Sequence, residues 1–215
     1  MIRLAAFLGN HGSQYEKTRH NVAWQFAAVL PFCAELRWQE KFKGEWACIE
    51  FPLFAKIAAE SFPQILNAEG ELPLPKSAPE KIYFLKPHTF MNLSGESIAA
   101  LASFFKIGAD EILVLHDELE LPLGTFGLKW AGGLAGHNGL RSAKATLGTQ
   151  DFWRIRFGIT KPAGRDIADY VLSNFSGDET ITMSIVFEKA CELFARAILS
   201  SDAQRLLPKW GKVKV

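Results

Sequence analysis

Cysteine is scarce in this chain, and no two cysteines have the spacing of a metal or redox motif. Cys33, Cys48 and Cys191 are isolated in apolar surroundings and form no CxxC. Disulfide frameworks and structural zinc sites both need clustered cysteines. We therefore expect buried, reduced thiols in a cytoplasmic protein.

The sequence also lacks a large charge of either sign and a long apolar run. Its formal net charge is +1, which excludes a uniformly basic coat for nucleic acid but leaves room for a local basic patch. No apolar run approaches the roughly 20 residues of a membrane-spanning helix, and no charged-then-apolar leader opens the chain. These absences predict a protein of the cytoplasm that does not use a membrane.

Several enzyme signatures are missing as well. There is no GxSxG, and Ser94 in NLSGES has the context of a helix cap. The segment AGGLAG lacks the GxGxxG spacing of a dinucleotide site. His20, His88, His116 and His137 come one per segment, without HxH or HExxH, which leaves metal-dependent hydrolysis as a distant alternative. We therefore predict neither a metal nor another cofactor.

What the sequence does contain is an alternation of apolar strands and amphipathic helices. Strands are predicted over 2–8, 45–54, 81–87, 111–117, 125–130 and 152–159. Helices are predicted over 18–29, from residue 94 onward, in a separate short segment that ends at residue 147, and after a capping box at 176–179. This alternation indicates a single α/β domain over 1–215, with a twisted, mixed and mostly parallel sheet flanked by helices. Residues 59–80, rich in Pro, Ala and Glu, are interpreted as a surface insertion.

Polar residues gather after several of the apolar runs. The segments are GNHGSQYEKTRHN (9–21), KPHTFMNLSG (86–95), HDELELP (116–122) and GLAGHNG (133–139). One such segment alone is explained by a turn and a helix cap at Thr18 or Asn21. Four of them favour a second interpretation, because loops at the carboxyl ends of strands assemble the active sites of α/β enzymes.

A histidine, a carboxylate and several side-chain amides have the chemistry of hydrolysis without a covalent intermediate. A neutral imidazole can take a proton from water while a carboxylate holds its tautomer. Asparagine side chains can donate to an oxyanion and bind a substrate amide. The residues thus predict hydrolysis of an activated ester. Two further polar residues on the strands have other interpretations, His116 as structural and Arg154 as solvated or ion-paired.

In their order and spacing, five segments resemble the signature blocks of bacterial-type peptidyl-tRNA hydrolases. They are the first three segments above together with GGLAGHNGLRS (132–142) and FWRIRFGITKP (152–162), and the resemblance covers roughly residues 2–199. It implies a single α/β domain that cleaves the ester between a peptide and the 3′ ribose of tRNA, as a monomer and without a metal or cofactor. The alternative is a non-catalytic RNA-binding protein on the same fold.

The resemblance also implies a role for each matched residue. His20 falls on the catalytic base, Asp117 on its carboxylate partner, and Asn10 on an amide that helps to separate blocked from free aminoacyl groups. The positions that bind substrate are matched by Tyr15, Phe90, Met91, Asn92, His137 and Asn138. The basic positions for tRNA phosphates are matched by Lys129, Arg156 and Arg165, with Lys129 expected near the mouth of the site. Because His20, Asp117, Asn10 and Asn92 are all present, activity is favoured over the non-catalytic alternative.

The chain departs from the family pattern in three places. His11 stands where the family usually has proline, which introduces a second titratable group beside the site. Leu134 and Ala135 occupy a stretch that the family usually fills with glycine, and we expect that loop to be less mobile. The 59–80 segment is longer than the family norm but contains no matched functional position.

Overall fold

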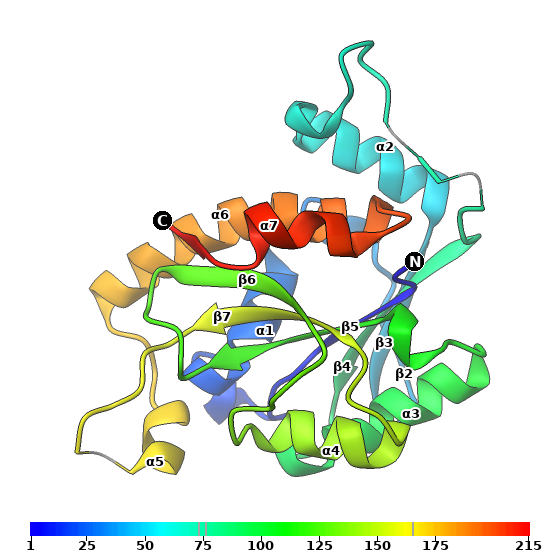
Figure 1. Cartoon of the computed structure of the whole chain (residues 1–215). Coiled ribbons are helices and arrows are strands. Elements are labelled where there is room, and N and C mark those ends of the chain that lie inside the picture. Colours follow the sequence, from blue (N-terminus) through cyan, green and yellow to red (C-terminus); the bar gives the residue numbers. More distant parts are fainter. Residues whose placement is uncertain (73, 76, 165) are drawn as a thin grey trace.

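In the computed structural model, which describes residues 1–72, 74–75, 77–164 and 166–215, the chain forms a mixed β-sheet with helices on both faces (Figure 1). The strands are β1 (Leu4–Phe7), β2 (Gln39–Lys41), β3 (Gly44–Glu50), β4 (Lys81–Pro87), β5 (Ile112–Glu118), β6 (Thr125–Trp130), β7 (Trp153–Gly158) and β8 (Val213–Lys214). The helices are α1 (Val22–Ala28), α2 (Phe51–Ser61), α3 (Ser94–Phe104), α4 (Asn138–Leu147), α5 (Ile167–Val171), α6 (Gly177–Leu199) and α7 (Leu207–Trp210). The short 3₁₀ turns that matter for the site are η1 (Ser13–Tyr15), η2 (Arg19–Asn21) and η5 (Met91–Leu93).

The sheet is parallel at its centre and antiparallel on both sides. Its strand order is β2-β3-β4-β1-β5-β7-β6-β8. Strands β4, β1, β5 and β7 run parallel to one another, and the remaining pairings are antiparallel. The predicted mixed α/β sheet is confirmed, but its parallel part is smaller than expected. One reason is that β2 and β3 are joined by a tight turn, which only an antiparallel pair allows.

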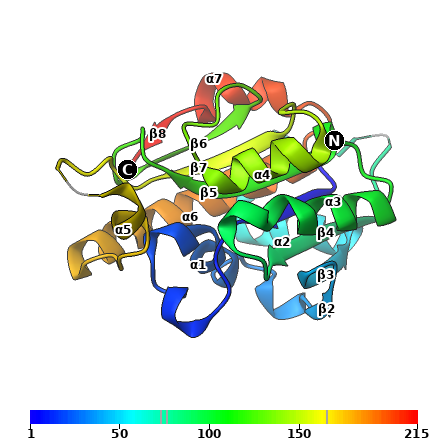
Figure 2. The ribbon, with the colours of Figure 1, turned by 90° about the horizontal axis from the view of Figure 1, so that it is seen from below.

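Apolar side chains form a core on each face of the sheet. On one face, α1 and α6 contribute Phe26 and Phe194, which pack with Phe7 of β1. On the other, α3 and α4 contribute Ile98 and Leu140, and Figure 2 shows these two helices side by side. Successive strand residues point to opposite faces of the sheet, and both faces are covered by a core. Every residue of β1 and β5 is therefore buried. These two strands therefore give the site a rigid base.

The segment after β3 differs from the sequence prediction. We predicted a strand over 45–54, but β3 ends at Glu50 and α2 begins at Phe51. Pro52 lies in the first turn of this helix, where its missing N–H costs nothing, whereas a strand would lose a ladder donor there. The first residues of the expected 59–80 insertion thus belong to α2. Figure 1 shows the loop after α2 at the top of the view and α4 and α5 at the bottom.

Arg154 is fully buried, which corrects its interpretation as a solvated or ion-paired residue. Its guanidinium donates to the backbone carbonyls of Ala131, Gly132 and Gly133. The loop after β6 covers this face of β7, so its carbonyls take the place of water around the charge. Arg154 thereby fixes the loop that leads to α4.

Two other expectations can be compared with the structure. The three cysteines are free thiols, but only Cys191 is buried, since Cys33 and Cys48 are half-buried. None of the helices in the described ranges is both long and apolar enough to cross a membrane.

Candidate active site

The polar segments that stood out in the sequence meet at the carboxyl end of the parallel strands. The loop after β1 carries Asn10 and His20, the loop after β4 carries Met91, and Asp117 lies near the end of β5. Strand β6 is antiparallel to β7, so the loop after it starts at the opposite end of the sheet and runs back to His137. All four segments line one cavity of about 620 Å³.

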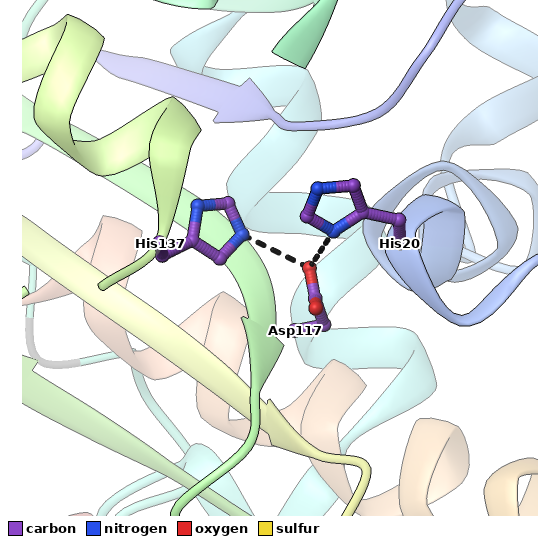
Figure 3. Close-up of side chains that lie close together, drawn as sticks. All are labelled: His20, Asp117 and His137. Carbon is purple, nitrogen blue, oxygen red and sulfur yellow. Dashed lines mark hydrogen bonds and ion pairs between the residues drawn. The ribbon is translucent and has the colours of Figure 1, made fainter. Parts of the chain in front are cut away.

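Asp117, which lines this cavity, connects two histidines that also line it (Figure 3). Its Oδ1 lies 2.8 Å from Nδ1 of His20 and 2.9 Å from Nε2 of His137. The carboxylate is buried, and the two imidazole centroids are 5.1 Å apart. It therefore joins the η2 turn to the beginning of α4, two elements that lie far apart in the sequence.

The charges in this cluster support one another. Burial favours a neutral carboxyl, but the adjacent His20 and His137 outweigh it and hold the pKa of Asp117 well below its usual range. Burial also disfavours a charged His20, yet the charge and hydrogen bond of Asp117 raise the pKa of this imidazole above its ordinary value. For His116, by contrast, burial and then the neighbouring His137 lower the pKa. His20 is thus the stronger base, and His116 keeps a structural interpretation.

The tautomer of His137 follows from its position as the N-cap of α4. Its Nδ1 accepts the backbone N–H groups of Gly139 and Leu140 at 3.1 and 3.4 Å. A backbone N–H only donates, so Nδ1 must carry the lone pair and Nε2 the proton. Nε2 then donates to Asp117, which accepts from Nδ1 of His20 as well. The free lone pair of the cluster is therefore on Nε2 of His20.

The same three side chains are close enough to be examined as a metal site. The ligand atoms of His20, Asp117 and His137 all lie within 4.8 Å of one another. However, the nitrogen of His137 that faces Asp117 carries a proton, because its other nitrogen already receives two backbone N–H groups. A protonated nitrogen has no lone pair for a cation. The donor set fits proton transfer better than metal binding.

Asn10 is oriented by hydrogen bonds to its neighbours. Its Oδ1 accepts the backbone N–H of Met91 at 2.8 Å. Its own backbone N–H and C=O bond to the side chain of Asn21 at 2.8 and 2.9 Å. Asn21 thus braces this loop, and neither it nor Thr18 caps a helix with its side chain. Ser94 is not a cap either, because it begins α3 and its Oγ faces Met91 Sδ.

Most of the residues matched to substrate binding reach the cavity. Phe90, Met91 and Asn92 line it from η5, and His137 and Asn138 line it from the start of α4. Phe90 is 63% exposed, whereas Met91 is buried and forms part of the wall.

Tyr15 and His11 do not line this cavity. Tyr15 is half-buried on η1 and is not among the residues that line the cavity. The exposed ring of His11 contacts the ring of His88 in a tilted arrangement, with centroids 4.1 Å apart, and neither ring belongs to the cavity wall.

Two of the basic residues assigned to tRNA, Lys129 and Arg156, lie on the sheet and do not line the cavity. Lys129 of β6 pairs with Arg154 of β7, which in turn pairs with Val114 of β5. Val114 precedes Asp117 by three residues, or roughly 10 Å of strand. Lys129 therefore does not line the cavity, and its backbone lies back along the sheet from Asp117 because β6 runs antiparallel to β7.

Arg156 lies on the same face of the sheet as Lys129. Lys129 is paired directly with Arg154, and Arg154 and Arg156 share a face because they are two residues apart on β7. It is half-buried and donates to the carbonyl of Gly211 at 2.8 Å. Arg165, the third basic position, lies outside the described residues.

Sequence reasoning missed one entire wall of the cavity. It is formed by α5 and its N-cap, and its lining residues are Asp166, Ile167, Ala168, Val171 and Leu172. Ile167 and Leu172 are 46% and 41% exposed, so this wall is apolar and open. The available signal was Asp166, whose side chain accepts the N–H of Ala168 as a helix cap. A helix of five residues is too short to give a periodic pattern.

Comparisons with known proteins agree with one another. A sequence model of the family described as "Peptidyl-tRNA hydrolase" matches residues 4–214. The chain is 39% identical over 218 residues to a peptidyl-tRNA hydrolase of Treponema pallidum, with 100% of this chain and 96% of the relative covered. It is 42% identical over 186 residues to a peptidyl-tRNA hydrolase of Rhodococcus erythropolis, with 86% and 85% covered. The crystal structure of peptidyl-tRNA hydrolase from Acinetobacter baumannii superposes with a TM-score of 0.73 at 28% identity, covering 97% of this chain and 91% of that one. These matches confirm the resemblance seen in the sequence, and the chain belongs to the peptidyl-tRNA hydrolase family.

Proposed function

We propose that this chain hydrolyses the ester bond between a peptide, or an N-blocked aminoacyl group, and the 3′ ribose of tRNA, with His20 as the general base. Membership of the family supports the reaction and disfavours a non-catalytic RNA-binding role. The observation that carries the assignment of roles is the chain of hydrogen bonds from His137 through Asp117 to His20. It leaves one basic nitrogen, Nε2 of His20, without a partner in the cluster.

The mechanism follows from this arrangement. Nε2 of His20 takes a proton from water, and the resulting hydroxide attacks the ester carbonyl. The tetrahedral intermediate then expels the 3′ oxygen of the ribose, which receives the proton from His20. The ionised Asp117 stabilises the imidazolium between these two steps. Asn10, Asn92 and Asn138 line the cavity, and in this mechanism their amides donate to the oxyanion or to the peptide backbone.

Asn10 also provides a basis for sparing aminoacyl-tRNA with a free amino group. Its Oδ1 is occupied by the N–H of Met91, so Nδ2–H is its free hydrogen-bonding group. A peptide or an N-acetyl group offers a carbonyl that accepts this hydrogen. A free α-ammonium offers only further donors, which is unfavourable opposite another donor in a site shielded from water.

The tRNA itself is proposed to contact the face of β6 and β7 that carries Lys129 and Arg156, together with Arg165. We also propose that the protein acts as a monomer in the cytoplasm. Every side chain used in the mechanism comes from one chain, so no second copy is required.

The test is release of deacylated tRNA from N-acetylaminoacyl-tRNA by chelator-treated protein. His20→Ala should reduce turnover by ~10²- to 10⁴-fold, the usual contribution of a general base. His88→Ala is the matched control, because this histidine lies outside the cavity, and it should keep the wild-type rate. A chelator-sensitive rate, or near-normal turnover by His20→Ala, would contradict the mechanism. Equal cleavage of free aminoacyl-tRNA would contradict the role of Asn10.

A further inference from the structure

Arg19 directly precedes the base His20 and carries a guanidinium that the mechanism above does not use. Its side chain is nearly buried, at 8% exposure. One terminal nitrogen lies 2.6 Å from Oε2 of Glu179. The other donates to Oγ of Ser173 at 2.8 Å and to the backbone carbonyl of Asn174. All three partners belong to the segment that connects α5 to the first turn of α6.

Other contacts join the same two segments. The guanidinium of Arg19 lies over the rings of Tyr170 and Phe175, at 4.5 and 5.2 Å from their centroids. Its backbone N–H donates to the carbonyl of Ser173 at 3.0 Å. Thr18 and Asn174 form an antiparallel bridge. The turn that carries the base is therefore fastened to the end of α5 through both backbone and side chain.

Glu179 is itself held in place as the partner of Arg19. It is part of the capping box of α6, in which its Oε2 accepts the N–H of Ser176 at 2.7 Å. Burial opposes its charge, but the hydrogen bonds from Ser176 and Arg19 outweigh this and lower the pKa of the carboxyl. Arg19 thus bonds to a fixed carboxylate at a helix terminus rather than to a mobile surface group.

Helix α5 has few other attachments. The hydroxyl of Tyr170 donates to the backbone carbonyl of Ile159, but within the five residues of α5 only Val171 is buried, and the lining residues Ile167 and Leu172 are exposed. Elements with few buried apolar contacts open most easily. The contacts of Arg19 therefore represent the main attachment of this wall to the turn that carries His20.

We propose that Arg19 is a positioning residue that holds the α5 wall of the cavity in fixed register with His20. The guanidinium touches neither the reacting atoms nor the cavity, so its effect passes through η2 on one side and α5 on the other. Contacts of the substrate with α5 and the placement of the base then depend on one another. This inference rests on the proposed function, because it takes His20 to be the base.

The test compares Arg19→Gln, Arg19→Lys and Glu179→Gln with the wild type. Glutamine at position 179 can keep the capping box, so this variant removes the ion pair with the least damage to α6. The matched control is Glu192→Gln, which removes another part-buried ion pair on α6, 2.7 Å from Arg196 and away from the cavity. Steady-state kinetics against pH, thermal unfolding and amide hydrogen exchange are measured for each protein.

We expect Arg19→Gln and Glu179→Gln to lower kcat/KM by about 10- to 100-fold, the cost of a misplaced catalytic group. The acid limb of the pH profile should move to lower pH, because a looser η2 turn weakens the bond from His20 to Asp117. Amides of α5 should exchange faster while those of α4 do not change. Arg19→Lys should recover part of the rate, since it keeps the charge but not the planar fork.

The inference is overturned if the folded variants keep the wild-type kcat/KM and pH limb and only lose thermal stability, as Glu192→Gln is expected to do. Should Arg19→Gln fail to fold, Glu179→Gln decides between the two outcomes. A wild-type protein that releases no tRNA contradicts the proposed function instead. An active wild type with unaffected variants contradicts only the role of Arg19.

Discussion

At the scale of single residues, the proposed role of His20 as the base predicts that its bond to Asp117 sets the pH dependence of the reaction. The pKa of His20 is raised above 6.5 because the charge of Asp117 outweighs burial. The base is active when neutral, so kcat/KM should rise with pH through an apparent pKa above that value. Asp117→Asn removes the charge that raises the pKa of His20 and leaves the burial that lowers it. The apparent pKa of the acid limb should then fall below 6.5. A pH profile of kcat/KM reports this group in the free enzyme. Identical limbs in the two proteins would contradict the assignment.

A second prediction concerns His137, which determines how an amide at position 117 would be oriented. Its Nε2 must donate, so in Asp117→Asn it holds the amide oxygen toward both histidines, and the tautomer of His20 survives. When His137 is also replaced, the amide can turn its NH₂ toward Nδ1 of His20 and force the proton onto Nε2. Serine is the suitable replacement at 137, because it can still cap α4.

We therefore expect the double variant Asp117→Asn with His137→Ser to lose more activity than the product of the two single losses. Turnover of all four proteins at high pH, analysed as a double-mutant cycle, measures this coupling. Purely multiplicative losses would show that His137 does not orient position 117.

These residues also show what the sequence can and cannot predict. His20 and Asp117 were predictable because their residue types and flanking segments match one kind of chemistry. Asn21 and Arg19 stand in the same segment, but their roles depend on contacts that the motif does not contain. Arg19 bonds to Glu179, 160 residues further along the chain. Such pairings arise from the fold and have no local signature.

At the scale of elements, the loop between β6 and α4 contains strained backbone. Ala135 lines the cavity with a φ of 48°, and Leu134 packs partly buried beside it. An L-residue in this left-handed region costs roughly 1–2 kcal/mol. Glycine would remove the strain but would gain freedom in the unfolded chain worth roughly 0.4–1 kcal/mol. Ala135→Gly should thus leave the free energy of unfolding unchanged or slightly higher.

The matched control for this prediction is Ala145→Gly, an exposed position within α4. There the same substitution should lower the free energy of unfolding by roughly 1 kcal/mol, the difference in helix propensity. Chemical denaturation measures both values, and hydrogen exchange should show a more mobile loop in Ala135→Gly. Equal destabilisation at the two positions would contradict the strain.

Two features of the fold were predicted wrongly, each for its own physical reason. The apolar run 45–54 was assigned to one strand because a short apolar run fits a buried strand and a buried helix equally well. The buried positions 51, 54, 55 and 58, which extend beyond that run, have helical spacing, and Pro52 marks the beginning of a helix. Likewise, the direction of β6 depends on which strand it pairs with. A single sequence does not contain that information.

At the scale of the whole molecule, the net charge of +1 conceals an uneven distribution. Lys129, Arg154 and Arg156 share one face of β6 and β7, beside the buried Glu118. The alternation of residues 152–159 predicted that the two arginines share a face, but not that other segments cover this face. Arg154 donates to the carbonyls of the loop after β6, and Arg156 donates one hydrogen bond to the carbonyl of Gly211. Lys129 is therefore the more suitable of the two tRNA candidates on this face for a test.

Lys129 lies near two like charges, Arg154 and Arg156, as well as the carboxylate of Glu118, and the net effect on its ammonium is unfavourable. Burial, followed by the repulsion of Arg154 and Arg156, lowers its pKa. A phosphate placed on this face would relieve that repulsion and release counterions. Lys129→Ala should therefore raise KM for full-length tRNA substrates and reduce the slope of log binding constant against log salt concentration by ~0.7–0.9.

A short N-blocked aminoacyl oligonucleotide ending in CCA should be cleaved at the wild-type rate, because the base and the amides are intact. The control is Lys56→Ala, an exposed lysine on α2, which should change neither value. If Lys129→Ala slowed both substrates equally, or left the salt dependence unchanged, this face would not be the one that binds tRNA.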